Sequence, residues 1–315
     1  MTSTSNVPLF IYVDVLRLLY VTIVIGFSSL FIGCASMELP SINYDETRIN
    51  ATENKLELTV MTWNIAHGRG LRYHQVNIRN KEELLRNLDG ISETILRENP
   101  DVVGFTEMDF KSSWNYKIDQ LDYIAEKCGY PYTARVVTHV VHVGIYQLKF
   151  GDAIMSKYPI KDVTSGYFNG KNNRWFASRK YVIARIDTPV GEFDLVHVHL
   201  SPFSGKKRLM QMTKLSEIAI ARDGNLVVLG DFNVTPFYLP MKHDVEAWNI
   251  LMDTNQFNEF KDDWLSEDKL TFRSHKPRKI LDYIFVGKKF EVLDYEVIKV
   301  KLSDHRPVKS TIIRK

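Results

Sequence analysis

The sequence has little cysteine and little net charge, and it lacks the short motifs of two large hydrolase classes. Its 315 residues include only two cysteines, Cys34 and Cys128, which excludes a disulfide framework and a cysteine-rich zinc site. The formal net charge of +3 is too small to indicate nucleic-acid binding by itself. No serine lies in a G-x-S-x-G turn and no P-loop is present, which excludes those two catalytic designs.

The composition is that of a globular protein with a sizeable core. Hydrophobic residues make up 44% of the chain and charged residues 25%, and one α/β domain with an N-terminal appendage fits the length. The positive charge gathers in three places: Arg174, Arg179 and Lys180; Lys206, Lys207 and Arg208; Arg273, Lys276, Arg278 and Lys279. Such runs usually lie in solvated loops, and a rim that attracts a phosphorylated substrate is the functional alternative.

The N-terminus predicts a targeting segment over residues 1–34. Residues 18–33 carry no charge, and this run suits the apolar region of an export signal better than a membrane span of about 20 residues. The sequence LFIGC around Cys34 resembles a bacterial lipoprotein signal, which implies lipid attachment at Cys34. The alternative is an uncleaved membrane anchor over residues 10–31, although Asp14 and Arg17 inside it would be costly. Both interpretations predict an exported, membrane-attached protein.

Beyond this segment the chain divides into a polar tether and one folded domain. Residues 35–55 are polar and lack periodicity, which is typical of a tether. The domain is expected over residues 56–315. Apolar residues at Leu84, Leu88, Ile91 and Ile95 have helical spacing and predict a helix over residues 80–98.

The rest of the domain predicts further helices and many strands. Helices are expected over residues 115–128, 206–222 and 245–255, and strands over residues 57–65, 101–107, 133–143, 146–155, 180–187, 193–200, 225–231, 280–286, 290–297 and 307–313. Because helices are interspersed with strands and hairpins, we expect an α/β (α+β) fold. Two mixed sheets would pack face to face with helices outside, as a four-layered sandwich.

Polar residues follow the apolar strands at the points where they end. These residues are Asn64, Glu107, His197, His199, Asp231 and Asn233, and Asp304 and His305 precede the last strand. The carboxylates and amides are hard oxygen ligands that suit Mg²⁺ or Mn²⁺, whereas the histidines are too scattered for a clear zinc site. A hard metal with histidines and basic rims indicates phosphoryl chemistry.

The same segments carry a family resemblance. TWNIAHGRG, GFTEMD, VHVHLSP, LGDFNVTP, LDYIFVG and LSDHRPV occur in the order found in the endonuclease/exonuclease/phosphatase superfamily. The resemblance extends from about Leu58 to Ile313, and GDFN followed at a distance by SDH is its most specific part. It implies metal binding by Glu107, with Asn64 beside it and Asp304 as a second carboxylate.

The resemblance also implies catalytic roles. Asp231 resembles the residue that positions or deprotonates the attacking water, helped by Asn233, and His305 and His199 resemble the histidines that contact the phosphate. Asp282 resembles the partner that orients His305. Arg179 and Arg208 match basic positions near the substrate. His197 shares a strand face with His199, so either imidazole could reach the site, and His199 is the one we expect there.

The reaction predicted is hydrolysis of phosphate esters by a divalent-metal-dependent phosphodiesterase or phosphatase, through in-line attack of activated water. The substrate would be a small phosphoester, a lipid head group or nucleic acid, and no protein partner is implied. One alternative is an extracytoplasmic nuclease, which should show a longer basic groove and a steep salt dependence. Another is an inactive binding scaffold, which should have lost a metal-binding or base residue, and none is lost.

Overall fold

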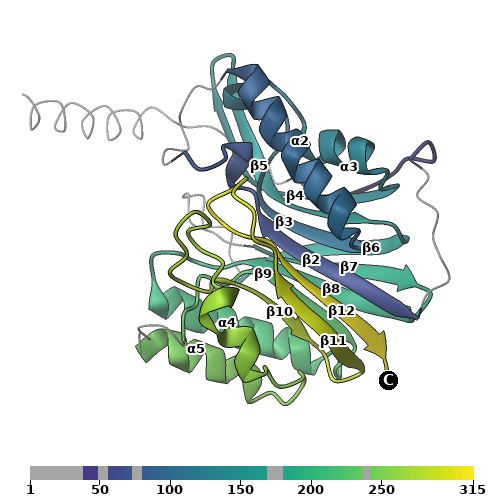
Figure 1. Ribbon diagram of the computed structural model, residues 1–315, viewed down its shortest axis with the longest axis vertical. Coiled ribbons are helices and arrows are strands. Elements are labelled where there is room, and N and C mark those ends of the chain that lie inside the picture. The colour runs from purple at the N-terminus through teal and green to yellow at the C-terminus, as the bar shows by residue number, and fades with distance from the viewer. Residues whose placement is uncertain (1–37, 49–55, 73–79, 169–179, 237–241) are drawn as a thin grey trace, which may run out of the picture.

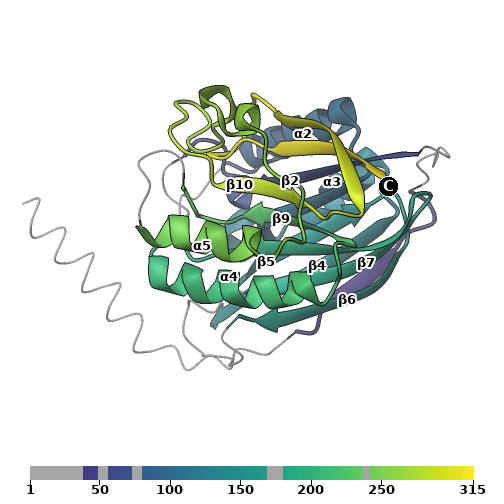
Figure 2. The same ribbon diagram turned by 90° about the horizontal axis from the view of Figure 1, so that it is seen from below.

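Two β-sheets lie face to face, and each carries a pair of helices on its outer side (Figures 1 and 2). The computed structural model describes residues 38–48, 56–72, 80–168, 180–236 and 242–315. The expected four-layered α+β sandwich of two mixed sheets is therefore confirmed.

The larger sheet has seven strands. Their spatial order is β1 (Ser41–Tyr44), β4 (Tyr132–Val143), β5 (Tyr146–Ser156), β3 (Val102–Asp109), β2 (Glu57–Asn64), β12 (Val308–Arg314) and β11 (Phe290–Val297). Strands β2 and β3 run parallel, and the other neighbours are antiparallel. The carboxyl ends of β2 and β3 therefore meet at one edge of this sheet.

The smaller sheet has five strands in the order β10 (Asp282–Val286), β9 (Leu226–Asp231), β8 (Gly191–His199), β7 (Lys180–Thr188) and β6 (Ile160–Tyr167). Only β8 and β9 are parallel. Their carboxyl ends meet in the same way, and β10 starts beside the end of β9 because Asp282 pairs with Asp231.

Four α-helices in the described residues cover the outer faces. They are α2 (Lys81–Glu98) and α3 (Gln120–Cys128) on the larger sheet, and α4 (Gly205–Ile220) and α5 (Lys242–Met252) on the smaller one. The helical spacing expected from the sequence is confirmed in α2, where Leu84, Leu88, Ile91 and Ile95 are all buried. Its start is also fixed locally, because the Asn80 side chain accepts a hydrogen bond from the Glu82 amide at 2.8 Å and caps the helix.

The core consists of three hydrophobic clusters. One lies between the sheets, and one lies between each sheet and its helices. Strand β2 contributes side chains to two of these clusters. Val60 packs between the sheets, and Met61 and Trp63 pack in the cluster that includes α2 residues. Successive side chains of a strand point to opposite faces. A strand buried on both faces offers polar groups to solvent only at its end, and that is where the candidate site residues lie.

Two strands differ from the expectation. The predicted tether contains β1, which pairs with β4 at the sheet edge, and its Tyr44 ring stacks on Tyr132 with centroids 4.8 Å apart. Strand β6 was also not predicted. Both lie at sheet edges and have largely polar sequences, SINY and IKDVTSGY, so backbone pairing holds them without a hydrophobic pattern.

The predicted export signal, including Cys34, lies outside the described residues. Within the described part of the chain, no helix is both long enough and apolar enough to cross a membrane. The prediction of membrane attachment at residues 1–34 therefore stays a prediction.

Candidate active site

The polar residues at the strand ends come together where the two sheets meet. Asn64 ends β2, Glu107 lies near the end of β3, His199 ends β8 and Asp231 ends β9. The parallel register places His199 opposite Asp231. Strand termini of both sheets thus hold these side chains on rigid backbone, which favours a fixed geometry.

His305 and Asp282 form a buried pair. Nδ1 of His305 lies 2.8 Å from an Asp282 oxygen, and Nε2 lies 3.8 Å from the Asp231 carboxylate. Burial alone would lower the pKa of His305, but the charges of Asp282 and Asp231 outweigh it and raise that pKa to about 10. The imidazole is therefore held as a cation at neutral pH, with Nε2 directed toward Asp231.

Asp231 is a buried carboxylate with several polar neighbours. It accepts hydrogen bonds from the Asn64 amide at 3.1 Å and from the Asn233 backbone at 3.0 Å, and Nε2 of His199 lies 3.6 Å away. Burial raises its pKa to about 7, against the opposing effect of the His305 charge. A carboxylate with this pKa can exchange a proton near neutral pH.

Asn233 shapes the turn that follows β9. Its backbone is in the left-handed region at φ 52°, a conformation that asparagine tolerates better than most residues. Its side chain donates to the Leu200 carbonyl at 3.2 Å. The GDFN segment is therefore both a turn that fixes Asp231 and part of the site, so the structural and functional interpretations of this motif coexist.

Glu107 and Asp304 share one cation that the sequence did not single out. The Arg69 guanidinium lies 2.6 Å from Asp304 and 3.9 Å from Glu107. The two carboxylates remain partly exposed, with 26% and 19% of their side-chain surface accessible. They thus form the open side of the site, while Asp231 and His305 form its buried side.

His67 is a further residue of this cluster. Its side chain is buried, with Nε2 3.6 Å from Glu107 and Nδ1 3.4 Å from Asp109. Burial alone would lower the pKa of His67, but the neighbouring carboxylates Asp109 and Glu107 together outweigh burial and raise that pKa. The only feature of the sequence that could have indicated a role for His67 is its position three residues after Asn64. In the structure, this segment has positive φ angles.

The two histidines of β8 have different surroundings. Both ring nitrogens of His197 are buried without a hydrogen-bond partner among the described residues, and burial lowers its pKa to about 3. His199, by contrast, approaches both Asp231 and Glu107, the latter at 3.9 Å. The two side chains lie on the same face of β8, as predicted. His197, two residues before the end of the strand, belongs to the core, whereas His199, at the end, lies at the site.

Arg208 does not lie at an exposed rim. Its side chain is only 2% accessible and pairs with Asp244, with Nε 2.9 Å from a carboxylate oxygen, while Nη1 donates to the Ser201 carbonyl at 3.0 Å. The expected substrate-binding position is therefore replaced by a structural ion pair between α4 and α5. Arg179 lies outside the described residues, and the neighbouring Lys180 is buried, with Nζ donating to the Val137 carbonyl at 3.0 Å.

Two sets of residues have the composition of a metal site. Asp231, Asp282 and His305 offer ligand atoms that all lie within 4.8 Å of one another. In the predicted set, Glu107 and Asp304 lie on the open side, whereas Asn64 is buried and its amide oxygen accepts a hydrogen bond from the Ala66 backbone at 3.0 Å.

Comparison with solved structures shows the same fold in several proteins. An endonuclease/exonuclease/phosphatase from Beutenbergia cavernae DSM 12333 is 21% identical, with a TM-score of 0.64 over 82% of this chain and 72% of that chain. The human Nocturnin catalytic domain with a bound sulfate anion is 17% identical, with a TM-score of 0.59 over 88% and 98%. A mannosyl-6-phosphatase from Bacteroides thetaiotaomicron VPI-5482 is 16% identical, with a TM-score of 0.56 over 81% and 99%.

Comparison with curated protein sequences gave no match. The sequence profile of the Endonuclease/Exonuclease/phosphatase family, however, matches residues 61–305. This match spans every strand-end residue described above from Asn64 to His305 and covers well over half of the chain. The chain therefore belongs to the endonuclease/exonuclease/phosphatase family.

Proposed function

We propose that this protein is a divalent-metal-dependent phosphoesterase that hydrolyses its substrate by in-line attack of activated water. The observation that carries the proposal is the environment of Asp231, a buried carboxylate with the Nε2 atoms of His199 and His305 at 3.6 and 3.8 Å. A buried proton acceptor can activate water, and the two imidazoles beside it can donate hydrogen bonds to a phosphoryl group.

The residues on the open side suit a hard divalent cation. Glu107 and Asp304 both approach the Arg69 guanidinium, so this structure already places positive charge between them. Their oxygens, together with the Asn64 amide, are the donors that Mg²⁺ or Mn²⁺ prefers. We assign metal binding to these three residues. When bound there, the ion would offset negative charge that develops on the phosphoryl oxygens.

The buried group of Asp231, Asp282 and His305 is the competing metal site, and we assign it to catalysis instead. Nδ1 of His305 is already engaged with Asp282 at 2.8 Å. That contact turns the opposite nitrogen toward Asp231, and hence toward the position where a phosphoryl oxygen would be contacted. Metal titration followed by isothermal calorimetry tests the assignment, because Glu107→Gln should weaken Mn²⁺ binding more than Asp282→Asn does.

Each of the site residues would have its own role in the reaction. Asp231 orients the attacking water and accepts its proton, and the Asn233 backbone and the Asn64 amide hold that carboxylate in place. His305 and His199 donate hydrogen bonds to the phosphoryl oxygens. Asp282 keeps His305 charged and correctly turned, the role that a buried carboxylate has behind a catalytic histidine in other hydrolases.

The experiment is an activity panel on the purified full chain. Bis(4-nitrophenyl) phosphate, 4-nitrophenyl phosphate, phospholipid vesicles and plasmid DNA are tested with Mg²⁺, with chelator, and with the Asp231→Asn variant. We expect chelator-sensitive hydrolysis that falls by about 10²- to 10⁴-fold in the variant. If no ester is hydrolysed in a metal-dependent way, the proposal fails. If plasmid DNA is cleaved far faster than the small esters, the nuclease alternative replaces it.

We also propose that residues 1–34 direct export and attach the protein to a membrane, through a lipid on Cys34 or through an uncleaved anchor. The support is the uncharged run of residues 18–33 followed by Cys34. Cell fractionation of the Cys34→Ser variant tests the first form. Release from the membrane fraction would support lipid attachment, and unchanged attachment would support the uncleaved anchor.

A further inference from the structure

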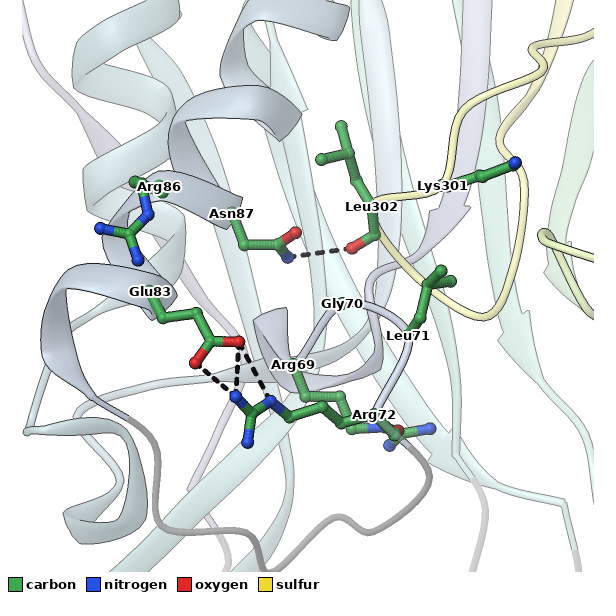
Figure 3. A pocket seen from close by; sticks show the side chains of 9 residues that line it. All are labelled: Arg69, Gly70, Leu71, Arg72, Glu83, Arg86, Asn87, Lys301 and Leu302. Atoms are coloured by element: carbon green, nitrogen blue, oxygen red, sulfur yellow. Dashed lines mark hydrogen bonds and ion pairs between the residues drawn. The ribbon is translucent and has the colours of Figure 1, made fainter.

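A pocket of about 490 Å³ lies beside the open side of the site. Three segments line it: the loop Arg69 to Arg72 after β2, the first turns of α2, and the residues Lys301 and Leu302 just before Asp304 (Figure 3). The pocket is therefore built from the segment that follows Asn64 and the segment that leads into Asp304. None of the catalytic residues proposed above lines it.

The walls of the pocket are fixed by packing and hydrogen bonds. The Asn87 side chain of α2 donates to the Gly68 carbonyl at 3.1 Å and to the Leu302 carbonyl at 2.9 Å, so one residue joins all three segments. Gly70 has a φ of 64°, and a Cβ there would lie 3.4 Å from the Asn87 amide oxygen. The cavity thus belongs to the folded framework and does not depend on one loose loop.

The lining is strongly basic. Among the residues that the structure describes, its charged members are the cations Arg69, Arg72, Arg86 and Lys301 and one carboxylate, Glu83. Arg72 pairs with Glu83 through Nε at 3.0 Å, as the dashed lines in Figure 3 mark. Arg86 and Lys301, on opposite sides of the pocket, have no ion-pair partner among the described residues. The pocket therefore has positive charge that no neighbouring acid neutralises, which favours a multiply charged anion.

Arg69 connects the pocket with the reaction centre. It lines the pocket and its side chain is 91% buried, with Nε donating to the Arg72 carbonyl at 2.9 Å. Its Nη2 contacts Asp304 at 2.6 Å, and its buried Nη1 lies 3.9 Å from Glu107 and has no hydrogen-bond partner in the part of the chain that the structure describes. The same side chain forms part of the pocket wall and of the proposed metal-binding side. An anion in the pocket would therefore lie next to the site of hydrolysis.

We propose that this pocket binds a phosphate group, namely a second phosphate of the substrate whose first phosphoester is hydrolysed at Asp231 and His305. The proposal rests on the proposed function, and it names the substrate class as compounds that carry two phosphate groups. Arg72 and Arg86 offer planar, forked donors and Lys301 a mobile point charge, the usual partners of phosphate oxygens. The catalytic centre needs only one phosphate, so the pocket determines specificity for the second.

The direct test is isothermal titration calorimetry with inorganic phosphate, in the presence of chelator, on the full chain. The Arg86→Ala/Lys301→Ala variant should weaken phosphate binding by at least about tenfold, because two charged partners are lost. The matched control, Lys288→Ala/Lys289→Ala, removes the same charge from the β10–β11 turn at the opposite end of the strands and should bind as the wild type does. Equal binding by the pocket variant, or no binding by the wild type, overturns the proposal.

A second measurement links the pocket to catalysis and separates the two proposals. The ratio of kcat/KM for fructose 1,6-bisphosphate to that for fructose 6-phosphate should exceed one in the wild type and should fall by about tenfold in the pocket variant. A ratio that the pocket variant leaves unchanged overturns the substrate assignment. If the activity panel shows no metal-dependent hydrolysis, the proposed function fails, and calorimetry still decides whether the pocket binds phosphate.

Discussion

His197 should make the folded protein sensitive to acid. Burial lowers the pKa of its imidazole to about 3, from 6.5 for an unperturbed histidine, so the unfolded state binds a proton more readily than the folded state. The stability that this neutral histidine preserves is fully present above pH 6.5 and is lost as the pH falls toward 3. At pH 5 the difference in pKa corresponds to about 2 kcal/mol of unfolding free energy.

Replacing His197 by leucine removes this titration and places an apolar side chain among apolar neighbours. We expect the loss of unfolding free energy between pH 8 and pH 5, measured by urea denaturation, to be about 2 kcal/mol smaller in His197→Leu than in the wild type. His142→Leu, at an exposed position of β4, is the matched control and should keep the wild-type pH dependence. If His197→Leu loses as much unfolding free energy between pH 8 and pH 5 as the wild type does, then His197 is not a buried neutral histidine.

Three further substitutions test other parts of the site. Asp282→Asn should lower kcat by about 10²-fold or more with little change in KM, because the catalytic histidine loses the acceptor that keeps it charged and oriented; steady-state kinetics decide this. Arg208→Ala should cost about 3 to 5 kcal/mol of unfolding free energy by leaving Asp244 buried without its partner, and an equally stable variant would contradict the structural role. We expect His67→Ala to weaken Mn²⁺ binding about tenfold or more, because Glu107 loses the neighbour that orients it. Calorimetry measures the affinity, and an unchanged value would contradict this.

Much of the fold is visible in the sequence because its elements bury apolar faces. The helical spacing in α2 and the apolar runs of β2, β3, β8 and β9 mark elements that pack on a core, and all five were predicted near their observed limits. Strands β1 and β6 escaped prediction because their sequences are largely polar. Their side chains contribute little to the core, and backbone pairing holds them, which leaves no periodic signal.

In the site, too, local features could be predicted from the sequence, whereas contacts between distant residues could not. The strand-end residues could be located because each lies at the end of an apolar run, as Asp231 ends β9, or just before one, as His305 precedes β12. The partners that decide the roles of Arg69 and Arg208 could not, since Arg69 meets Asp304 across 235 residues of sequence and Arg208 meets Asp244 across 36. A charged residue in a basic run looks the same in the sequence whether it faces solvent or a buried carboxylate.

A reconstitution curve measures whether hydrolysis by this protein depends on a divalent metal. The full chain is stripped of metal with chelator, and hydrolysis of bis(4-nitrophenyl) phosphate is followed as Mg²⁺ or Mn²⁺ is added back, for the wild type and for Glu107→Gln. We expect no activity in the stripped protein, saturable recovery in the wild type, and recovery in Glu107→Gln only at much higher metal concentration. Full activity in the stripped protein, or identical curves for the two proteins, would contradict this expectation.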